Sequence, residues 1–325
     1  MTEKLLEIEN LSLNYKVYEG HLKVLNGVVF TVNKGEKVGL IGESGCGKTT
    51  SMRAIMRTLP SNASITGGKI LFKGKNILNS SMDEIQNIRR NNISMIFQDP
   101  TAALNPVFKI GEMLSDIIRF SSKTQGKGLT KESIKEKAIE VLKDVALPDP
   151  ERILQNYPIQ LSGGMRQRVC IAMALIASND LLIADEPGTS LDVTIEDQIL
   201  RLLGNLVKER GTSIILISHA LGAVKGLVDR VYVMYAGNMI EVAMTDDLFS
   251  EPLHPYTSNL FKTVPKLTGG GIPEAIKGRI PDYFDPPKGC RFCPRCEHAM
   301  PICEKEIPSF RNVGAGHEVA CFLYS

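Results

Sequence analysis

The sequence predicts an α/β fold with a largely parallel sheet. Short apolar runs, which suit strands buried on both faces, alternate with longer segments of helical spacing. This alternation is typical of parallel sheets that are covered by helices. The apolar runs are KVGLI (37–41), ISMIF (93–97), LLIAD (181–185), SIILI (213–217) and VYVMY (231–235).

Length and composition narrow the possible classes of protein. A chain of 325 residues suffices for one large domain with an appendage, or for two domains. The net charge of +2 gives no strong electrostatic footprint for nucleic acid. No apolar run reaches the ~20 residues of a membrane helix, and the acidic N-terminus lacks the apolar core of a signal peptide. We therefore expect a cytoplasmic protein whose membrane connection comes through a partner.

The remaining elements follow along the chain. Residues 5–32 have a rough period of two and predict short strands around a polar turn. Helical spacing follows the first buried strand, and two further helices at about 110–145 have no strand between them, which predicts a helical insertion. The TGGG segment (268–271) predicts a flexible joint, beyond which Pro, Cys and Arg accumulate with little periodicity.

The segment GESGCGKTT (42–50) has the pattern of a phosphate-binding loop, with a strand before it and a helix after it. Its glycines let backbone N–H groups turn toward a phosphate, and the helix N-terminus adds its positive end. Lys48 supplies a charge to the β- and γ-phosphates, and the Thr49 hydroxyl can bind Mg²⁺. The segment predicts a P-loop NTPase (RecA-like) core.

Two further motifs carry groups suited to nucleotide chemistry. In LLIADEP (181–187) two carboxylates follow a buried strand at the edge where α/β sheets bind ligands. Asp185 suits the Mg²⁺ shell, and Glu186 can polarise a water molecule. In LSGGMRQRV (161–169) a serine can cap the following helix, and two glycines let a phosphate approach the backbone.

The order of these motifs resembles the ATPase subunits of ABC transporters, and the resemblance covers essentially the whole chain. It continues through FQDP (97–100), SLD (190–192) and ISHA (217–220). The segments QLSGGMRQRV, IADEP, LDVT and HPYT and the cysteine tail resemble the oligopeptide/dipeptide importer branch. The resemblance implies a nucleotide-binding domain over 1–267, with an N-terminal antiparallel β-subdomain and a helical subdomain at about 100–175, and a C-terminal extension with a metal-cluster site over 268–325.

The resemblance also implies roles for individual residues. Each ATP would lie between the phosphate loop of one subunit and the LSGG signature of another, so hydrolysis would require a dimer. Glu186 would be the general base, and His219 would touch the γ-phosphate. Gln98 would bind Mg²⁺ or the lytic water, and Thr49 and Asp185 would complete the Mg²⁺ shell. The groups around the nucleotide would be Tyr15 on adenine, Ser44, Gly45, Cys46, Gly47, Lys48, Thr49 and Thr50 around the phosphates, and Ser162, Gly163, Gly164 and Asp192 in trans.

The chain departs from the family pattern at four positions. Ala220 follows the histidine where importers usually carry Asp, which leaves open how His219 is held. Gly188 stands where Thr is usual, and Ile159 where His is often found. Met165 replaces the Gln of other branches but is normal in this one. None of these changes removes a core catalytic residue.

Five of the seven cysteines lie between 290 and 321, with the spacing C-x₂-C-x₂-C-x₆-C-x₁₇-C. In a reducing compartment such crowding favours a metal site over disulfides. The spacing favours an iron–sulfur cluster, and zinc with His298 or His317 remains open. The family tail, matched here by GCRFCPRC, AMPIC and HEVAC, implies a 4Fe–4S cluster, and it leaves Cys293 on a variable position. Because the sequence offers no redox partner or second cofactor site, we expect the cluster to have a structural role. The implied ligands are Cys290, Cys296, Cys303 and Cys321.

The resemblance implies an ATPase that energises import of di- or oligopeptides from the cytoplasmic face of the cell membrane. Its partners would be a second, homologous ATPase subunit in a heterodimer, two transmembrane permease subunits and a solute-binding protein, with no nucleic acid. Import of nickel or another small solute remains open, as does a redox-sensing ATPase gated by the cluster. DNA-repair and chromosome ATPases need a long coiled coil, and no sustained heptads occur here.

Overall fold

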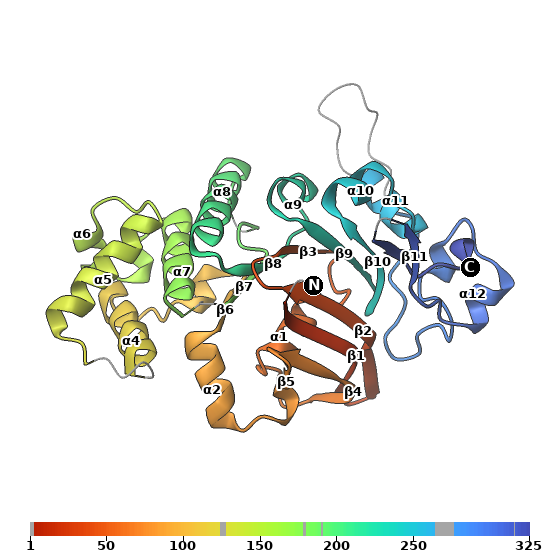
Figure 1. Ribbon diagram of the computed structural model, residues 1–325, viewed down its shortest axis with the longest axis horizontal. Helices are drawn as coiled ribbons and strands as arrows, with labels where there is room; N and C mark the ends of the chain where they lie inside the picture. Colours follow the sequence, from red (N-terminus) through yellow and green to blue (C-terminus); the bar gives the residue numbers. More distant parts are fainter. Residues whose placement is uncertain (1–2, 124–127, 178–179, 190, 264–275, 315) are drawn as a thin grey trace. The chain divides into compact units, whose positions relative to one another are not determined.

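The computed structural model describes residues 3–123, 128–177, 180–189, 191–263, 276–314 and 316–325 (Figure 1). The chain forms two compact units. The first contains residues 1–33, 37–79 and 217–325, and the second contains residues 34–36 and 80–216. The predicted TGGG joint lies outside the described residues, so the proposed domain boundary near residue 268 stays a prediction.

The first unit contains an antiparallel sheet in the order β2-β1-β4-β5. Alternate residues of β1 point into the core, because Leu6, Ile8, Leu11 and Leu13 are fully or almost fully buried. A register shift between Ile8 and Leu11 keeps both on the buried side. The predicted N-terminal strands are thus confirmed, and they pair with a strand that periodicity did not show. The strands are β1 (Lys4–Val17), β2 (Gly20–Asn33), β4 (Ala63–Phe72) and β5 (Lys75–Asn76).

A second set of strands in this unit follows the order β11-β12-β10-β9-β3. Strand β3 (Lys37–Ile41) runs parallel to β9 (Arg230–Tyr235), and β10 (Asn238–Met244) is antiparallel to β9. The cysteine-rich extension contributes β11 (Arg311–Gly314) and β12 (His317–Val319), and β12 pairs with β10. The extension is therefore hydrogen-bonded to the strands of the nucleotide-binding fold.

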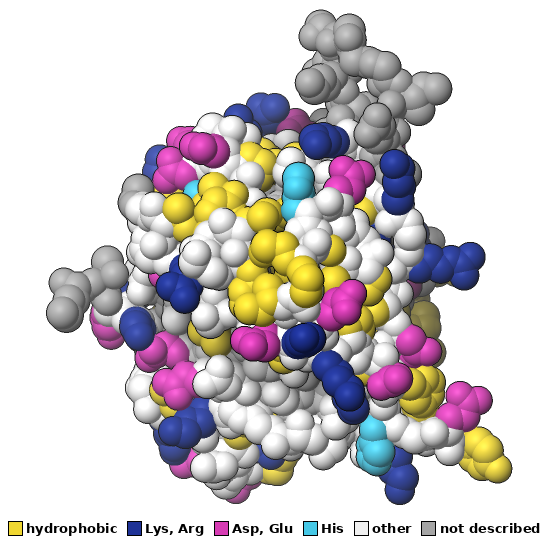
Figure 2. Space-filling model, turned by 90° about the vertical axis from the view of Figure 1, so that its right-hand side faces the viewer, with side chains coloured by type: hydrophobic (Ala, Val, Ile, Leu, Met, Phe, Trp, Pro, Cys, Tyr) yellow, Lys and Arg dark blue, Asp and Glu magenta, His cyan; other side chains and the backbone are white. Residues whose placement is uncertain are grey.

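Helices complete the first unit, and Figure 1 shows the last of them in the blue C-terminal region. The extension exposes several apolar side chains, namely Ile302, Ile307, Val313 and Leu323. Figure 2 faces this side of the molecule and shows apolar side chains gathered among charged ones. The helices are α1 (Lys48–Ile55), α9 (Leu221–Leu227), α10 (Thr245–Ser250), α11 (Pro255–Lys262) and α12 (Pro301–Lys305).

The second unit is built on the parallel pair β6 (Ile93–Ile96) and β7 (Leu181–Asp185), with β8 (Ser213–Ile217) beside β7. All residues of these strands are buried, as their apolar runs predict. The described residues between α4 and α5 contain no strand, as expected for the helical insertion. The helices are α2 (Met82–Asn91), α3 (Pro100–Ala103), α4 (Ile110–Lys123), α5 (Lys131–Asp144), α6 (Pro150–Gln155), α7 (Gly163–Ala177) and α8 (Val193–Arg210).

Candidate functional site

The phosphate loop joins β3 to α1 in the first unit, as predicted. The Lys48 side chain is 6% exposed and folds back along the loop. Its ammonium group donates to the carbonyls of Gly42 at 2.8 Å and Glu43 at 3.1 Å. The ammonium group that would face a phosphate is therefore hydrogen-bonded to backbone carbonyls of the loop itself. Ser44 and Gly45 are exposed, and Thr49 and Thr50 are half-buried at the start of the helix.

Two glycines of the loop have a conformation that requires glycine. Gly42 and Gly47 have φ of 151° and 110°, in the region that L-residues rarely adopt. A Cβ on Gly42 would overlap the Met234 carbonyl, and one on Gly47 would stand 2.8 Å from Leu25. The loop therefore packs tightly against the strands beneath it.

Tyr15 and Cys46, both predicted at the nucleotide, lie against the same loop. The Tyr15 hydroxyl stands 3.4 Å from Thr50 Oγ1, so the half-buried ring is next to the first turn of α1. Cys46 is fully buried, and burial raises the pKa of its thiol. Its carbonyl accepts from the N–H of Gly237 at 2.8 Å. Cys46 therefore contributes packing and backbone, because a protonated buried thiol is inert.

His219 is exposed just after the end of β8. The next residue, Ala220, donates its N–H to Ser218 Oγ at 3.0 Å, which closes the turn into α9. The hydroxyl of Ser218 thus closes this turn without an acidic side chain at position 220. The position of His219 matches the expectation, and its contact with a γ-phosphate stays a prediction.

The carboxylates of the second unit lie at the end of β7. Asp185 is 4% exposed, and Glu186 is half-buried. Gln98 donates from Nε2 to Glu186 Oε2 at 2.7 Å, and the Thr189 hydroxyl donates to the same oxygen at 3.2 Å. Glu186 has φ of 49°, in the left-handed region, where a non-glycine residue is strained. Gln98 and Glu186 are thus joined by a hydrogen bond although they are 88 positions apart, and their roles at a nucleotide stay predictions.

The LSGG signature opens α7. Ser162 accepts from the N–H of Met165 at 3.3 Å, which is the predicted cap. Asp192 caps α8 by accepting from Ile195 N–H at 3.0 Å. A Cβ on Gly163 would stand 3.1 Å from Leu191, and one on Gly164 would stand 3.0 Å from Ile195. The absence of side chains at the two glycines therefore lets the start of α7 lie close to α8.

Gly188, one of the departures, has a packing reason. A Cβ at this position would stand 2.5 Å from Cγ of Glu196 on α8. The loop after β7 thus approaches α8 so closely that a larger residue at position 188 would require Glu196 to move.

The predicted site residues therefore fall into two groups. Tyr15, the phosphate loop and His219 belong to the first unit, and Gln98, Asp185, Glu186, the signature and Asp192 belong to the second. Each group is assembled within its own unit. The closing of both groups on one nucleotide, and of the signature on a second subunit's ATP, stays a prediction.

The five cysteines of the extension converge on one cavity of about 20 Å³. Phe292, Met300 and His254 also line it, so its surface is largely apolar. Burial raises the pKa of the Cys290 thiol to about 11 and also raises the pKa values of Cys293, Cys296 and Cys321. Over the described residues, no three His, Cys, Asp or Glu side chains form a group that could hold a metal ion. The five cysteines border one cavity, and the cluster and its ligands stay predictions.

Comparison with known proteins identifies the class. The ABC transporter family matches residues 25–189, and the oligopeptide/dipeptide transporter C-terminal region matches residues 240–303. Two solved structures share the fold. One is a dimeric ATP-binding cassette bound to ADP and Pi in a post-hydrolysis state, with 26% identity, a TM-score of 0.66, and coverage of 74% of this chain and 99% of that chain. The other, part of a Clostridium perfringens cbiONQ transporter complex, has 28% identity, a TM-score of 0.63, and coverage of 77% and 92%.

Curated relatives match almost end to end. The dipeptide transport ATP-binding protein DppD of Bacillus subtilis is 43% identical over 99% of this chain and 95% of its own length. The oligopeptide transport ATP-binding protein OppD of Salmonella typhimurium is 42% identical over 98% of this chain and 93% of its own. The chain belongs to the ABC transporter family, as an ATP-binding subunit with the P-loop NTPase fold. It is an ATPase that uses ATP with Mg²⁺. Among the described helices, none has both the length and the apolarity needed to cross a membrane.

Proposed function

We propose that this chain hydrolyses ATP to energise the import of di- or oligopeptides. The observation that carries the proposal is the presence of both family regions on one chain, with about 43% identity to dipeptide and oligopeptide transport ATP-binding proteins along nearly its whole length. The domains proposed are a nucleotide-binding domain over 1–267 and the extension over 268–325.

The catalytic roles follow from the two groups of residues. Lys48 and the N-terminus of α1 bind the phosphates, and Tyr15 stacks on the adenine. Glu186, held by Gln98 at 2.7 Å, accepts the proton of the attacking water. Thr49, Gln98 and Asp185 would hold Mg²⁺, which would supply positive charge to the phosphates.

The remaining residues act either within the chain or on a second subunit. His219 contacts the γ-phosphate within its own chain, while Ser162, Gly163, Gly164 and Asp192 act on the ATP of the partner. A helix N-terminus that begins with two half-buried glycines, next to the exposed Ser162, is suited to a phosphate that arrives from outside. We propose a homologous ATPase as the partner, in a heterodimer. Specific ATPase activity that stays constant on dilution to monomer would contradict this arrangement.

The working complex also contains two transmembrane permease subunits and a solute-binding protein, and it places this chain at the cytoplasmic face of the membrane. The test is ATP hydrolysis by the complex reconstituted in liposomes. Dipeptide- or hexapeptide-loaded binding protein should raise the rate several-fold. If nickel or another small solute raises the rate of ATP hydrolysis and peptide does not, the transported substrate is that solute and not a peptide.

We also propose that the thiols of Cys290, Cys296, Cys303 and Cys321 bind a 4Fe–4S cluster, with zinc as the alternative. The donor set suits iron–sulfur chemistry, because five thiols line one apolar cavity. Iron and sulfide are measured in single Cys→Ser variants purified without oxygen. Loss of iron in Cys293→Ser but not in Cys290→Ser would overturn the ligand assignment, and bound zinc would overturn the cluster. A redox-gated ATPase would show rates that differ between the oxidised and reduced cluster.

A further inference from the structure

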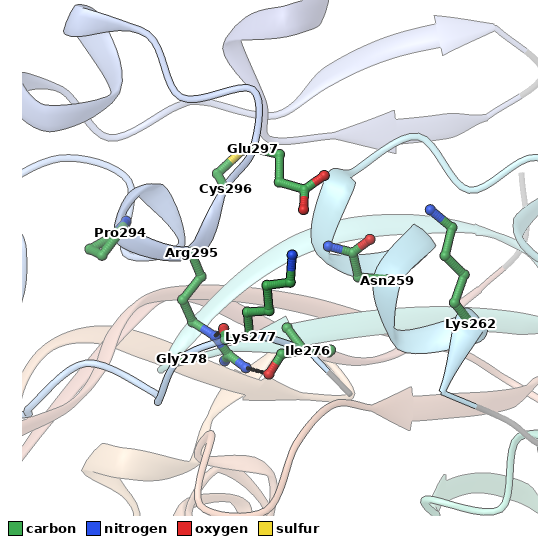
Figure 3. Close-up of a pocket in the computed structure, with 9 residues that line it drawn as sticks. All are labelled: Asn259, Lys262, Ile276, Lys277, Gly278, Pro294, Arg295, Cys296 and Glu297. Atoms are coloured by element: carbon green, nitrogen blue, oxygen red, sulfur yellow. Dashed lines mark hydrogen bonds between the residues drawn. The ribbon is translucent and has the colours of Figure 1, made fainter. Parts of the chain in front are cut away.

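The cysteine-rich extension makes direct contact with the phosphate loop through Arg295 and Tyr283, two residues to which the predicted site gives no role. Arg295 lies between Pro294 and Cys296, in the loop that carries the clustered cysteines. Its side chain is 4% exposed, and Figure 3 shows it reaching away from Cys296 toward Ile276. At its end it meets Glu43, the second residue of the phosphate loop.

The pairing of Arg295 with Glu43 is bidentate. Nη1 donates to Glu43 Oε2 at 2.8 Å, and Nη2 donates to Oε1 at 3.1 Å. The other three N–H groups of the guanidinium also have acceptors, namely Tyr235 Oη at 3.2 Å, the Ile276 carbonyl at 3.2 Å and the Lys277 carbonyl at 2.9 Å. All five donors of the side chain are thus used, which fixes its orientation.

Glu43 is in turn connected to the catalytic lysine. Its carbonyl accepts from Lys48 Nζ at 3.1 Å, and its N–H donates to the Tyr256 hydroxyl at 2.8 Å. The extension contacts the loop a second time through Tyr283, whose hydroxyl donates to the Gly45 carbonyl at 2.7 Å. The conformation of the phosphate loop therefore depends on groups supplied by residues 276–325.

A carboxylate in this loop poses an electrostatic problem. ATP brings several negative charges to the loop, and a carboxylate a few ångströms away would repel them. Arg295 neutralises the Glu43 side chain and directs it toward the extension. The buried position of the guanidinium makes this pairing less sensitive to salt than a surface ion pair.

We propose that Arg295 is a positioning residue for ATP, which holds Glu43 away from the phosphates and cancels its charge. The cysteine-rich extension thereby completes the phosphate loop of its own chain. The inference rests on the proposed function only in that the loop binds ATP, and it is independent of the transported solute.

The test measures the Kd of Mg-ATP by calorimetry, and the kcat and KM of hydrolysis, for the full chain. Arg295→Gln leaves an unpaired carboxylate and should raise Kd about tenfold, with a much smaller change in kcat. Glu43→Gln removes the carboxylate and should leave Kd within about twofold. The double variant should recover most of the lost affinity, because it has no unpaired charge. Arg311→Gln, an exposed arginine of the same extension, is the matched control.

A second comparison keeps Arg295 intact in case its removal prevents folding. Glu43→Asp retains the charge but shortens the side chain, so it should weaken ATP binding several-fold, whereas Glu43→Gln should not. Equal affinities of wild-type and Arg295→Gln protein for ATP would overturn the inference. It would also be overturned if the double variant bound ATP as weakly as Arg295→Gln, or if Glu43→Gln bound ATP as weakly as Glu43→Asp. A wild-type chain without affinity for ATP would overturn the proposed function as well, whereas the outcomes above leave it intact.

Discussion

His254 is a buried histidine whose burial has a measurable consequence for stability. The side chain is 1% exposed and packs 5.7 Å from the Phe292 ring between centroids. Its Nδ1 accepts from the N–H of Tyr256 at 3.0 Å, so it caps the start of α11. Burial lowers its pKa from 6.5 to about 3. Replacement by Asn keeps an acceptor at the cap but removes the imidazole.

The lowered pKa of His254 determines how the stability of the folded chain changes with pH. Above about pH 6.5 the histidine is neutral in both the folded and the unfolded chain. Below that value the unfolded chain binds a proton that the folded chain does not bind until about pH 3, so stability is lost as the pH falls through this window. Each pH unit within the window costs about 1.4 kcal/mol, and the loss by about pH 5 is therefore about 2 kcal/mol.

The assay is urea unfolding followed by circular dichroism at about pH 7.5 and about pH 5. Wild-type protein should lose about 2 kcal/mol more than His254→Asn between the two conditions, and contributions common to both proteins cancel in this difference. His21→Asn, at an exposed position of β2, is the matched control and should behave as wild type. An equal loss in His254→Asn and wild type would refute the assignment of the effect to this residue.

Three further substitutions test other parts of the structure. Glu186→Gln should keep ATP binding but reduce kcat by about 10²- to 10⁴-fold in a phosphate-release assay, and an unchanged kcat would rule out its role as general base. Phe292→Ala removes a ring that is 1% exposed and packed on Tyr235 and Tyr256, so it should lower the free energy of unfolding by about 3–5 kcal/mol. A loss below about 1 kcal/mol would show that this ring does not anchor the extension. Gly237→Ala would place a Cβ against the Val24 carbonyl at a φ of 81°, so urea unfolding should report a loss of roughly 2 kcal/mol or more, and a neutral effect would contradict this packing.

The parts of the fold that the sequence predicts are those with a local signal. The phosphate loop is a pattern within nine residues, flanked by a buried strand and an apolar helix face, and all three are found where expected. Strand β4 was missed because Gly67 and Gly68 interrupt its alternation. The left-handed conformation of Glu186 was also missed, because its sequence context is that of an ordinary strand end.

The contacts of the extension have no local signal. Arg295 and Glu43 are 252 positions apart, and Tyr283 and Gly45 are 238 apart. Glu43, Gly45 and Tyr283 lie in loops, and Arg295 ends a 3₁₀ helix of three residues (Cys293–Arg295), so no periodic pattern signals either pair. Cysteine spacing identified the extension as unusual, and the family tail suggested its ligands. The buried contact between His317 Nε2 and Glu241 Oε1, at 2.8 Å, likewise depends on the pairing of β12 with β10, which short strands do not reveal.

The late position of these partners has a consequence for biosynthesis. The phosphate loop leaves the ribosome long before Tyr283 and Arg295, which are 238 and 252 positions behind the residues that they contact. At ordinary elongation rates this delay is on the order of tens of seconds. During that time the nascent chain carries Glu43 without its counter-charge and β10 with an open edge. A truncated product would therefore contain every nucleotide motif and still lack a finished nucleotide site.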